Sequence, residues 1–393
     1  MLKNQSLNNE SEAILPALDI PESLNYIAVF LTLKCHLNCS YCINDPQQGS
    51  DRKNIFKQEK VSLSPLEWAK GLGRLKLHDD LPVTLQGGEP MIYGKGKGVG
   101  ELLELLPFKF DLLTAFPFTP ERLALAFNGQ QEKLKRKAPY PSIRVSYHPD
   151  QMEKLWHGVG FEELVDRCVG MKDFGFSVSP NKSESDIGIY MVDHPENTFT
   201  ERMRSALKDK VSFEEKEFLG EHEGQLYGTY RYPYSTNLVS SSTWNKTISC
   251  ECRTSELLLD PLGFAWGCHF HLYENWVNGG PAQAFQKLAD HEYDFSCLSP
   301  EDFGKHPVMP IGHILDPAFS LDRLGEFRTC HFYGRCIGCD TKVKNNRFQS
   351  LDDEKKPHTS VEIRAIQIDP ALEQKFLTEV SRDDLAEFKA SKP

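Results

Sequence analysis

The sequence predicts an α/β fold built around a parallel sheet, because strand-like and helix-like segments alternate through its first half. Six such units would form an open, partial (β/α)6 barrel. The chain has 393 residues, which is long enough for this domain and a smaller second one. Seven of the eleven cysteines lie after residue 245. This crowding predicts a small cysteine-rich domain in the C-terminal part of the chain.

Six segments read as the strands of the parallel sheet. They are residues 26–33, 82–86, 110–116, 142–148, either 176–179 or 187–192, and 211–218. In a barrel of parallel strands, functional residues gather at the carboxyl ends of the strands. We therefore expect the residues that directly follow these segments to share one site.

Helices are expected between the strands. Ser64 can cap a helix, Pro65 suits its first position, and Glu67 completes a capping box. Further helices are expected at residues 120–135 and 198–208, and one around 161–169, where apolar residues recur with helical spacing. Cys168 falls on that apolar stripe, so it is expected in the core.

A cysteine motif follows the first expected strand. Cys35, Cys39 and Cys42 have the spacing C-x3-C-x2-C. Three thiolates on one loop can hold three irons of a 4Fe–4S cluster, and the fourth iron is then free to bind another molecule. A zinc site is the alternative, but zinc usually takes four ligands. His36 could be the fourth, although it lies between the first two cysteines and would strain the loop.

A second motif, Gly87-Gly88-Glu89-Pro90, follows the second expected strand. Two glycines allow the backbone to turn sharply and to approach a ligand closely. A carboxylate beside them can pair with an ammonium group of a ligand. Taken by itself, the motif is also compatible with an ordinary turn.

Together these residues resemble the radical S-adenosylmethionine (SAM) superfamily over roughly residues 25–193. Tyr41 also matches the aromatic or apolar residue that is usual before the last cysteine of that family's loop. The resemblance implies a partial, TIM-like barrel and an iron that chelates the methionine part of SAM. It also implies that one electron cleaves SAM to methionine and a 5′-deoxyadenosyl radical, which takes a hydrogen atom from the substrate.

The same resemblance assigns contacts with SAM. Gly87, Gly88 and Glu89 would line the methionine amino group, and the backbone near Tyr41 would contact adenine. Polar residues after the fourth and fifth strands often bind the ribose or carboxylate of SAM in the family; here these are Ser146, His148, Ser179 and Asn181. Ser146 is the candidate retained for SAM, and capping of loops is the alternative for all four. The family's glycine-rich signature at the fifth strand is absent.

The cysteine-rich part carries a further pattern. Cys252 and Cys268 enclose residues 257–266, which read as strand, turn and strand, in a C-x10-G-x4-C arrangement, and Cys336 and Cys339 form a later C-x2-C pair. A zinc ribbon is one explanation. The pattern also resembles the SPASM/twitch extension of radical SAM enzymes, which implies an auxiliary 4Fe–4S cluster on these four cysteines. Cys250 and Cys330 stay possible as replacement ligands, and the cluster could relay electrons or bind substrate.

These expectations divide the chain into four parts. Residues 1–22 are expected to be a flexible tail, 23–245 the radical SAM core, 246–350 the auxiliary-cluster domain, and 351–393 a charged extension. Eleven cysteines without a secretory signal indicate the reducing cytoplasm. The net charge of −11 argues against nonspecific nucleic-acid binding, and the sequence has no apolar run of membrane-spanning length.

The sequence therefore predicts a cytoplasmic radical SAM enzyme with one auxiliary cluster. Peptide or protein modification is the leading hypothesis, and a small metabolite or nucleotide is the alternative substrate. The resemblance further implies a reductant such as ferredoxin or flavodoxin as a partner. A zinc-binding interaction module and an electron carrier that never cleaves SAM are the alternatives from other classes.

Overall fold

The computed structural model describes part of the chain. The described residues are 15–21, 24, 26–39, 41–42, 62–77, 81–218, 220–223, 225–227, 249–254, 256–269, 271–272, 310–330 and 361–367. Within these ranges no helix has both the length and the apolar character needed to cross a lipid bilayer.

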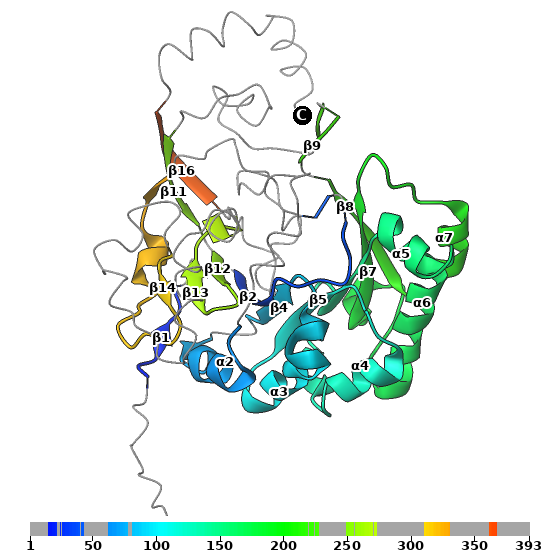
Figure 1. The fold of residues 1–393 in the computed structure, drawn as a ribbon, viewed down its shortest axis with the longest axis horizontal. Coiled ribbons are helices and arrows are strands. Elements are labelled where there is room, and N and C mark those ends of the chain that lie inside the picture. The colour runs from blue at the N-terminus through cyan, green and yellow to red at the C-terminus, as the bar shows by residue number, and fades with distance from the viewer. Residues whose placement is uncertain are drawn as a thin grey trace, which may run out of the picture.

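A nine-stranded sheet forms the centre of the molecule (Figure 1). Its strands, in the order in which they pair, are β14 (Gly312–His313), β13 (Phe264–Trp266), β12 (Glu256–Leu259), β2 (Tyr26–Thr32), β4 (Val83–Gly87), β5 (Phe110–Thr114), β6 (Ile143–Tyr147), β7 (Ile187–Asp193) and β8 (Ser212–Glu217). All neighbours from β12 to β8 run parallel. The mixed α/β class is thus confirmed, and closure into a partial barrel stays a prediction.

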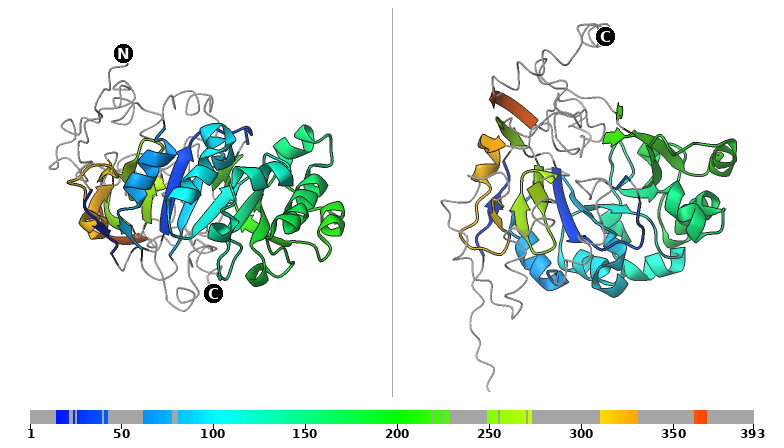
Figure 2. Two further views of the ribbon diagram at one scale, coloured as in Figure 1. Left: turned by 90° about the horizontal axis from the view of Figure 1, so that it is seen from below. Right: turned by 45° about the horizontal axis from the view of Figure 1, so that its top comes forward.

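Six helices follow one another along the outer side of this sheet (Figures 1 and 2). They are α2 (Pro65–Leu72), α3 (Gly98–Leu105), α4 (Pro120–Ala126), α5 (Pro149–Leu155), α6 (Gly160–Gly170) and α7 (Glu201–Leu207). Short 3-10 helices occur at Pro90–Gly96, Gln131–Leu134, Met171–Phe174, Lys182–Glu184 and Asp322–Gly325. The arrangement leaves the opposite face of the sheet clear of these six helices.

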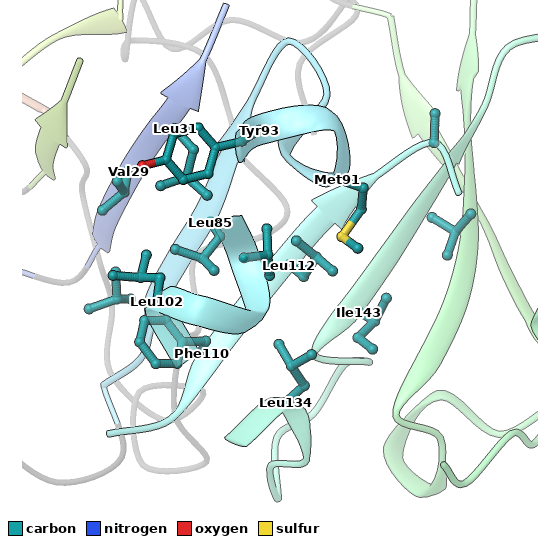
Figure 3. Close-up of a cluster of buried hydrophobic side chains, with 14 of the residues drawn as sticks. Val29, Leu31, Leu85, Met91, Tyr93, Leu102, Phe110, Leu112, Leu134 and Ile143 are labelled. Atoms are coloured by element: carbon teal, nitrogen blue, oxygen red, sulfur yellow. The ribbon is translucent and has the colours of Figure 1, made fainter. Parts of the chain in front are cut away.

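The core lies between the sheet and the helices. Alternate residues of each strand point to this side, because side chains of a strand alternate between faces. Val29, Leu85, Leu112 and Ile143, from four neighbouring strands, have no measurable exposure, and Figure 3 shows them together with Leu102 of α3. Burial of these apolar surfaces is the main force that holds the helices against the sheet.

Local sequence rules explain two helices well. The Ser64 hydroxyl accepts a hydrogen bond from the Glu67 amide at 3.3 Å, and the Glu67 carboxylate accepts one from the Ser64 amide at 2.7 Å, so the capping box is confirmed. Helix α6 buries Phe161, Leu164 and Cys168 as its periodicity predicts, and Cys168 is a core residue.

The expected helix at residues 120–135 is wrong in its length. Helix α4 ends at Ala126, and a separate 3-10 helix covers Gln131–Leu134. The break coincides with Asn128 and Gly129, whose φ angles are 51° and 75°. This left-handed conformation ends a helix, and asparagine and glycine are the residues that tolerate it best.

The C-terminal segments join the fold at two places. Strands β12 and β13 form the expected hairpin, but the hairpin extends the main sheet, with β12 parallel to β2. A separate sheet has the order β15 (Arg328–Cys330), β11 (Ser249–Thr254) and β16 (Val361–Gln367). Strand β16 thus belongs to the segment that was expected only to be a charged extension.

Two small sheets complete the described structure. Strand β1 (Leu18–Asp19) pairs in parallel with β3 (Leu75–Lys76), and β9 (Gly220–His222) pairs with β10 (Gln225–Tyr227). Arg74, which directly precedes β3, donates to the carbonyl oxygens of Pro16 and Ile314. Residues 16–19 of the expected flexible tail are therefore attached to the domain.

Candidate cofactor site

The cysteine loop starts where β2 ends and lies against the Gly87-Gly88-Glu89 segment at the end of β4. The Gly88 amide donates to the Thr32 carbonyl at 2.7 Å, and the Glu89 amide donates to the Lys34 carbonyl at 2.7 Å. Two motifs that are far apart in the sequence are therefore joined by main-chain hydrogen bonds. They meet at the carboxyl edge of the sheet, where the sequence predicted a shared site.

The two glycines make this contact possible. A Cβ atom at Gly88 would overlap with the carbonyl oxygens of Leu33 and Lys34, and one at Gly87 would overlap with that of Thr32. Gly87 also has a φ of 145°, which side chains disfavour. The close approach expected at these glycines is thus an approach to the cysteine loop itself, and their contact with a ligand stays a prediction.

Glu89 is a buried connector between two strand ends. Its carboxylate accepts hydrogen bonds from the Met91 amide at 2.9 Å, from the Thr114 hydroxyl at 2.7 Å and from the Ala115 amide at 2.7 Å. Burial raises the pKa of Glu89 to about 7, against the opposing effect of these three donors. The carboxylate therefore ties β4 to the end of β5, and its predicted pairing with an ammonium group stays a prediction.

The three cysteines have surroundings that fit an iron–sulfur cluster. Cys39 is buried, and Cys35 and Cys42 are half-buried. Burial, together with the nearby charges of Glu89 and Cys42, raises the pKa of Cys35 to about 12. A buried thiolate here requires a strong cationic partner, and thiolate sulfur suits iron–sulfur clusters. The Leu37 amide also donates to the Cys35 sulfur at 3.4 Å, a bond that favours the thiolate.

Within the described part of the chain, no three Cys, His, Asp or Glu side chains converge closely enough to hold one metal ion. In a 4Fe–4S cluster each cysteine binds a different iron, so the ligands need not converge on a single point.

Tyr41 lies against residues that follow β6 and β7. Its hydroxyl is 3.4 Å from Nδ1 of His148, and its ring stacks on that of His194, with centroids 4.8 Å apart. The structure thus brings together Tyr41 and His148, which the sequence had singled out separately. Ser146 is half-buried on β6, on the face of the sheet opposite the helices, and its contact with SAM stays a prediction.

His194 was missed by the sequence analysis, and Ser179 and Asn181 were wrongly placed there. The fifth parallel strand is Ile187–Asp193, so Ser179 and Asn181 precede it and lie away from its carboxyl end. Asn181 instead accepts a hydrogen bond from the Ser183 amide at the start of a short 3-10 helix. If 187–192 had been chosen as the strand, Asp193 and His194 would have followed it. This position is the signal in the sequence that could have identified His194.

The candidate auxiliary ligands are only partly described. Cys252 lies in β11, Cys268 follows β13, and Cys336 and Cys339 lie outside the described residues. Cys250 stands directly opposite Cys330 in the backbone register of β11 and β15. The proposed ligand set stays a prediction, with Cys250 and Cys330 still possible as replacements.

The residue after Cys268 connects this region to the main sheet. His269 Nδ1 is 3.3 Å from a carboxylate oxygen of Glu256 in β12, and its ring meets that of Phe30 in β2 edge-on, with centroids 5.8 Å apart. The end of the hairpin therefore contacts the strand from which the first cysteine loop starts.

Comparisons with known proteins give the following results. No family model matches the sequence, and no curated protein matches it. Twelve solved chains match in structure. Native anSMEcpe with bound AdoMet (SAM) and the Cp18Cys peptide is 12% identical, with a TM-score of 0.39 over 86% of this chain and 95% of that one. Hexahistidine-tagged anSMEcpe with bound AdoMet is 12% identical, with a TM-score of 0.40 over 96% of each chain.

Streptococcus suis SuiB bound to the precursor peptide SuiA is also 12% identical, with a TM-score of 0.29 over 70% of this chain and 69% of that one. Because the TM-scores are below 0.5, the functional proposal depends on the residues of this chain alone.

Proposed function

We propose that this protein is a radical SAM enzyme in which Cys35, Cys39 and Cys42 hold a 4Fe–4S cluster. The main support is the junction between the cysteine loop and the Gly87-Gly88-Glu89 segment, made by two 2.7 Å main-chain hydrogen bonds. When bound, the cluster supplies the electron that cleaves SAM to methionine and a 5′-deoxyadenosyl radical. The protein's own contribution is to bind and orient the reactants and to exclude water.

The surrounding residues have separate roles in this proposal. Gly87 and Gly88 let the cysteine loop approach β4 closely. In this proposal the same segment lines the methionine amino group of SAM. Glu89 holds the ends of β4 and β5 together and faces the methionine amino group. The backbone near Tyr41 contacts adenine, and Ser146 binds a polar group of SAM. Burial of Cys39 and Tyr41 keeps water from this part of the loop.

The proposal includes an auxiliary 4Fe–4S cluster on Cys252, Cys268, Cys336 and Cys339, within a partial barrel joined to a cysteine-rich domain. The contact of His269 with β2 supports a position of Cys268 near the core strands. The register of Cys250 opposite Cys330 keeps these two as alternative ligands. A peptide or protein is the proposed substrate and a small metabolite the alternative. A cytoplasmic ferredoxin or flavodoxin is the proposed source of electrons.

Anaerobic reconstitution tests the cofactor proposal. The wild-type protein should bind about eight irons in two clusters and absorb at roughly 400 nm. Reduction with dithionite in the presence of SAM should release 5′-deoxyadenosine. Cys39→Ala should abolish this release, because one iron loses its ligand. Cys168→Ala is the matched control, since Cys168 is a buried core residue of α6. Zinc without visible absorption would support the interaction module instead.

The substrate class needs a separate experiment. A short peptide encoded beside the gene should be produced with deuterated amino acids and incubated with the reduced enzyme and SAM. Transfer of deuterium into 5′-deoxyadenosine would identify the peptide as the hydrogen donor. If deuterium is absent from 5′-deoxyadenosine while SAM is still cleaved, the small-metabolite alternative is favoured.

A further inference from the structure

The second half of the cysteine loop has an anchor of its own, formed by Tyr41, His148 and His194. The Tyr41 and His194 rings are nearly parallel, at 25°, with centroids 4.8 Å apart. The Tyr41 hydroxyl is 3.4 Å from Nδ1 of His148. Tyr41 and His194 are only 6% and 4% exposed. We refer to these three side chains as the Tyr41 clamp.

His194 is itself held firmly at the end of β7. Its amide donates to the Val192 carbonyl at 2.8 Å, and its Nδ1 accepts a hydrogen bond from the Glu196 amide at 3.2 Å. The edge of its ring meets Phe218, with centroids 4.5 Å apart and an angle of 72°. The imidazole therefore presents a fixed face to Tyr41, and a pre-ordered aromatic face gives up little entropy when it stacks.

A hydrogen bond from the main chain of the cysteine loop to helix α5 supports the same anchor. The Asn38 amide donates to the Gln151 side chain in α5 at 3.4 Å, and α5 begins directly after His148. The loop is thus attached at both ends. Its start is bonded to the Gly87-Gly88-Glu89 segment of β4, and its end lies on the carboxyl ends of β6 and β7.

We propose that the Tyr41 clamp positions Cys39 and Cys42 for the cluster before any iron is bound. Tyr41 is adjacent to Cys42 in the chain, and the Cys42 amide donates to the Cys39 carbonyl at 3.4 Å. Fixing the Tyr41 ring therefore restricts the backbone that carries both thiols. His148 and His194 are positioning residues here, and this inference rests on the proposed cluster at the three cysteines.

Hydrogen–deuterium exchange on the metal-free protein tests the clamp without any cofactor. His194→Ala removes the stacking face, so amides of residues 36–42 should exchange about five- to tenfold faster, the change expected from one lost aromatic pair. His194→Phe keeps a planar ring and should stay near the wild-type rate. His157→Asn, at an exposed histidine outside the clamp, is the matched control.

Global stability is followed in the same experiment through the peptides of β2, β4 and β5. If His194→Ala speeds exchange throughout these strands, the variant destabilises the whole domain and does not isolate the loop. Tyr41→Phe then tests whether the clamp orders the loop. It keeps the ring stack but loses the contact with His148, so it should speed exchange only in residues 36–42. Unchanged exchange of residues 36–42 in both His194→Ala and Tyr41→Phe would overturn the clamp.

Chelator-driven iron release from the reconstituted protein gives a second readout. His194→Ala should lose iron about five- to tenfold faster than wild type, and His194→Phe should not. A wild-type protein that binds no cluster contradicts the proposed function, whereas exchange in the metal-free protein still decides the clamp. A stable wild-type cluster with equal release rates in all variants refutes the clamp alone.

Discussion

Two buried carboxylates, Glu89 and Asp260, accept hydrogen bonds that organise the chain over different distances. Glu89 receives donors from Thr114 and Ala115, which are 25 and 26 residues away. Asp260 accepts hydrogen bonds from the Leu262 and Phe264 amides and from the Trp266 indole, which lie within six residues of it. Glu89 joins the ends of β4 and β5 next to the cysteine loop, and Asp260 closes the turn between β12 and β13.

This difference shows how the two cysteine regions are built. The turn that leads to Cys268 has a local component, because Asp260 accepts hydrogen bonds from donors in the next six residues. Distant residues also bind this turn, since the Leu63 amide donates to the Pro261 carbonyl at 2.8 Å. The first cysteine loop depends on contacts between segments that meet only when the parallel sheet forms. Disturbing Glu89 should therefore affect a shared site, whereas disturbing Asp260 should affect one hairpin.

The largest effect is expected from Glu89→Ala. It leaves two buried amides and a hydroxyl without their acceptor, so the free energy of unfolding should fall by roughly 3–5 kcal/mol. Urea unfolding gives this value, and iron analysis after reconstitution should show loss of the first cluster. Asp260→Ala should lower stability by a similar amount, since it also leaves three donors unpaired.

The proposed difference between Glu89 and Asp260 is tested by measuring whether Glu89→Ala and Asp260→Ala still bind the first cluster. After Asp260→Ala, iron on the first cysteine loop and release of 5′-deoxyadenosine should persist under conditions in which the protein is folded. Equal loss of the first cluster in both variants would show that the hairpin and the loop are not separate. Glu89→Gln and Asp260→Asn, which keep part of the acceptor set, are the milder controls.

The pH dependence of stability provides the next largest effect. Burial raises the pKa of Glu89 to about 7 in the folded protein, whereas its ordinary value is 4.5. Between these values the native state binds a proton that the unfolded state does not, so this group loses its stabilising contribution as pH rises from 4.5 through 7. The full change is roughly 3 kcal/mol.

Urea unfolding of wild type and Glu89→Gln at several pH values between 4.5 and 8 measures this contribution. The variant should be less stable at low pH, because its amide cannot accept every bond, but its stability should fall less steeply as pH rises. Glu101→Gln, at an exposed glutamate of α3, controls for removal of one carboxyl group. Parallel curves for wild type and Glu89→Gln would contradict a raised pKa.

Local features of the fold were predictable because the residues involved are neighbours in the sequence. The capping box at Ser64 and Glu67 and the hairpin around Gly263 are of this kind. The helix break at Asn128 and Gly129 was predictable too, since asparagine followed by glycine signals a turn, but the apolar pattern around it was given more weight.

Contacts between distant segments were not predictable from one sequence. Nothing around Thr114 indicates that its hydroxyl binds Glu89, and nothing around Glu256 indicates that β12 pairs in parallel with β2. At the site, the loop and the glycine motif were found because their spacing is specific. His194 was missed because two segments were equally acceptable as the fifth strand, and only one of them places a residue beside Tyr41.

The smallest predicted effect compares two glycines, each close to one of the carboxylates. At Gly88 a methyl group would overlap main-chain oxygens of the cysteine loop, which cannot move aside without shifting the loop. At Gly263 a methyl group would come within 2.8 Å of the Leu63 side chain and 3.1 Å of the His313 ring, and the φ of 91° there adds backbone strain. Gly88→Ala should cost about 1–3 kcal/mol and Gly263→Ala about 1–2 kcal/mol in urea unfolding.

The two glycine variants should differ more in cluster binding than in stability. Gly88→Ala displaces Leu33 and Lys34, directly before Cys35, so the reconstituted protein should lose iron from the first cluster. Gly263→Ala strains the turn that Asp260 closes and crowds the Leu63 and His313 side chains, but its added methyl group does not meet the main chain of residues 33–34 as that of Gly88→Ala does, so the first cluster should form normally. If Gly88→Ala binds the full complement of iron, the close approach of loop and β4 is not what places the thiols. The loop would then take its position from the Tyr41 side alone, and His194→Ala should have the larger effect on iron retention.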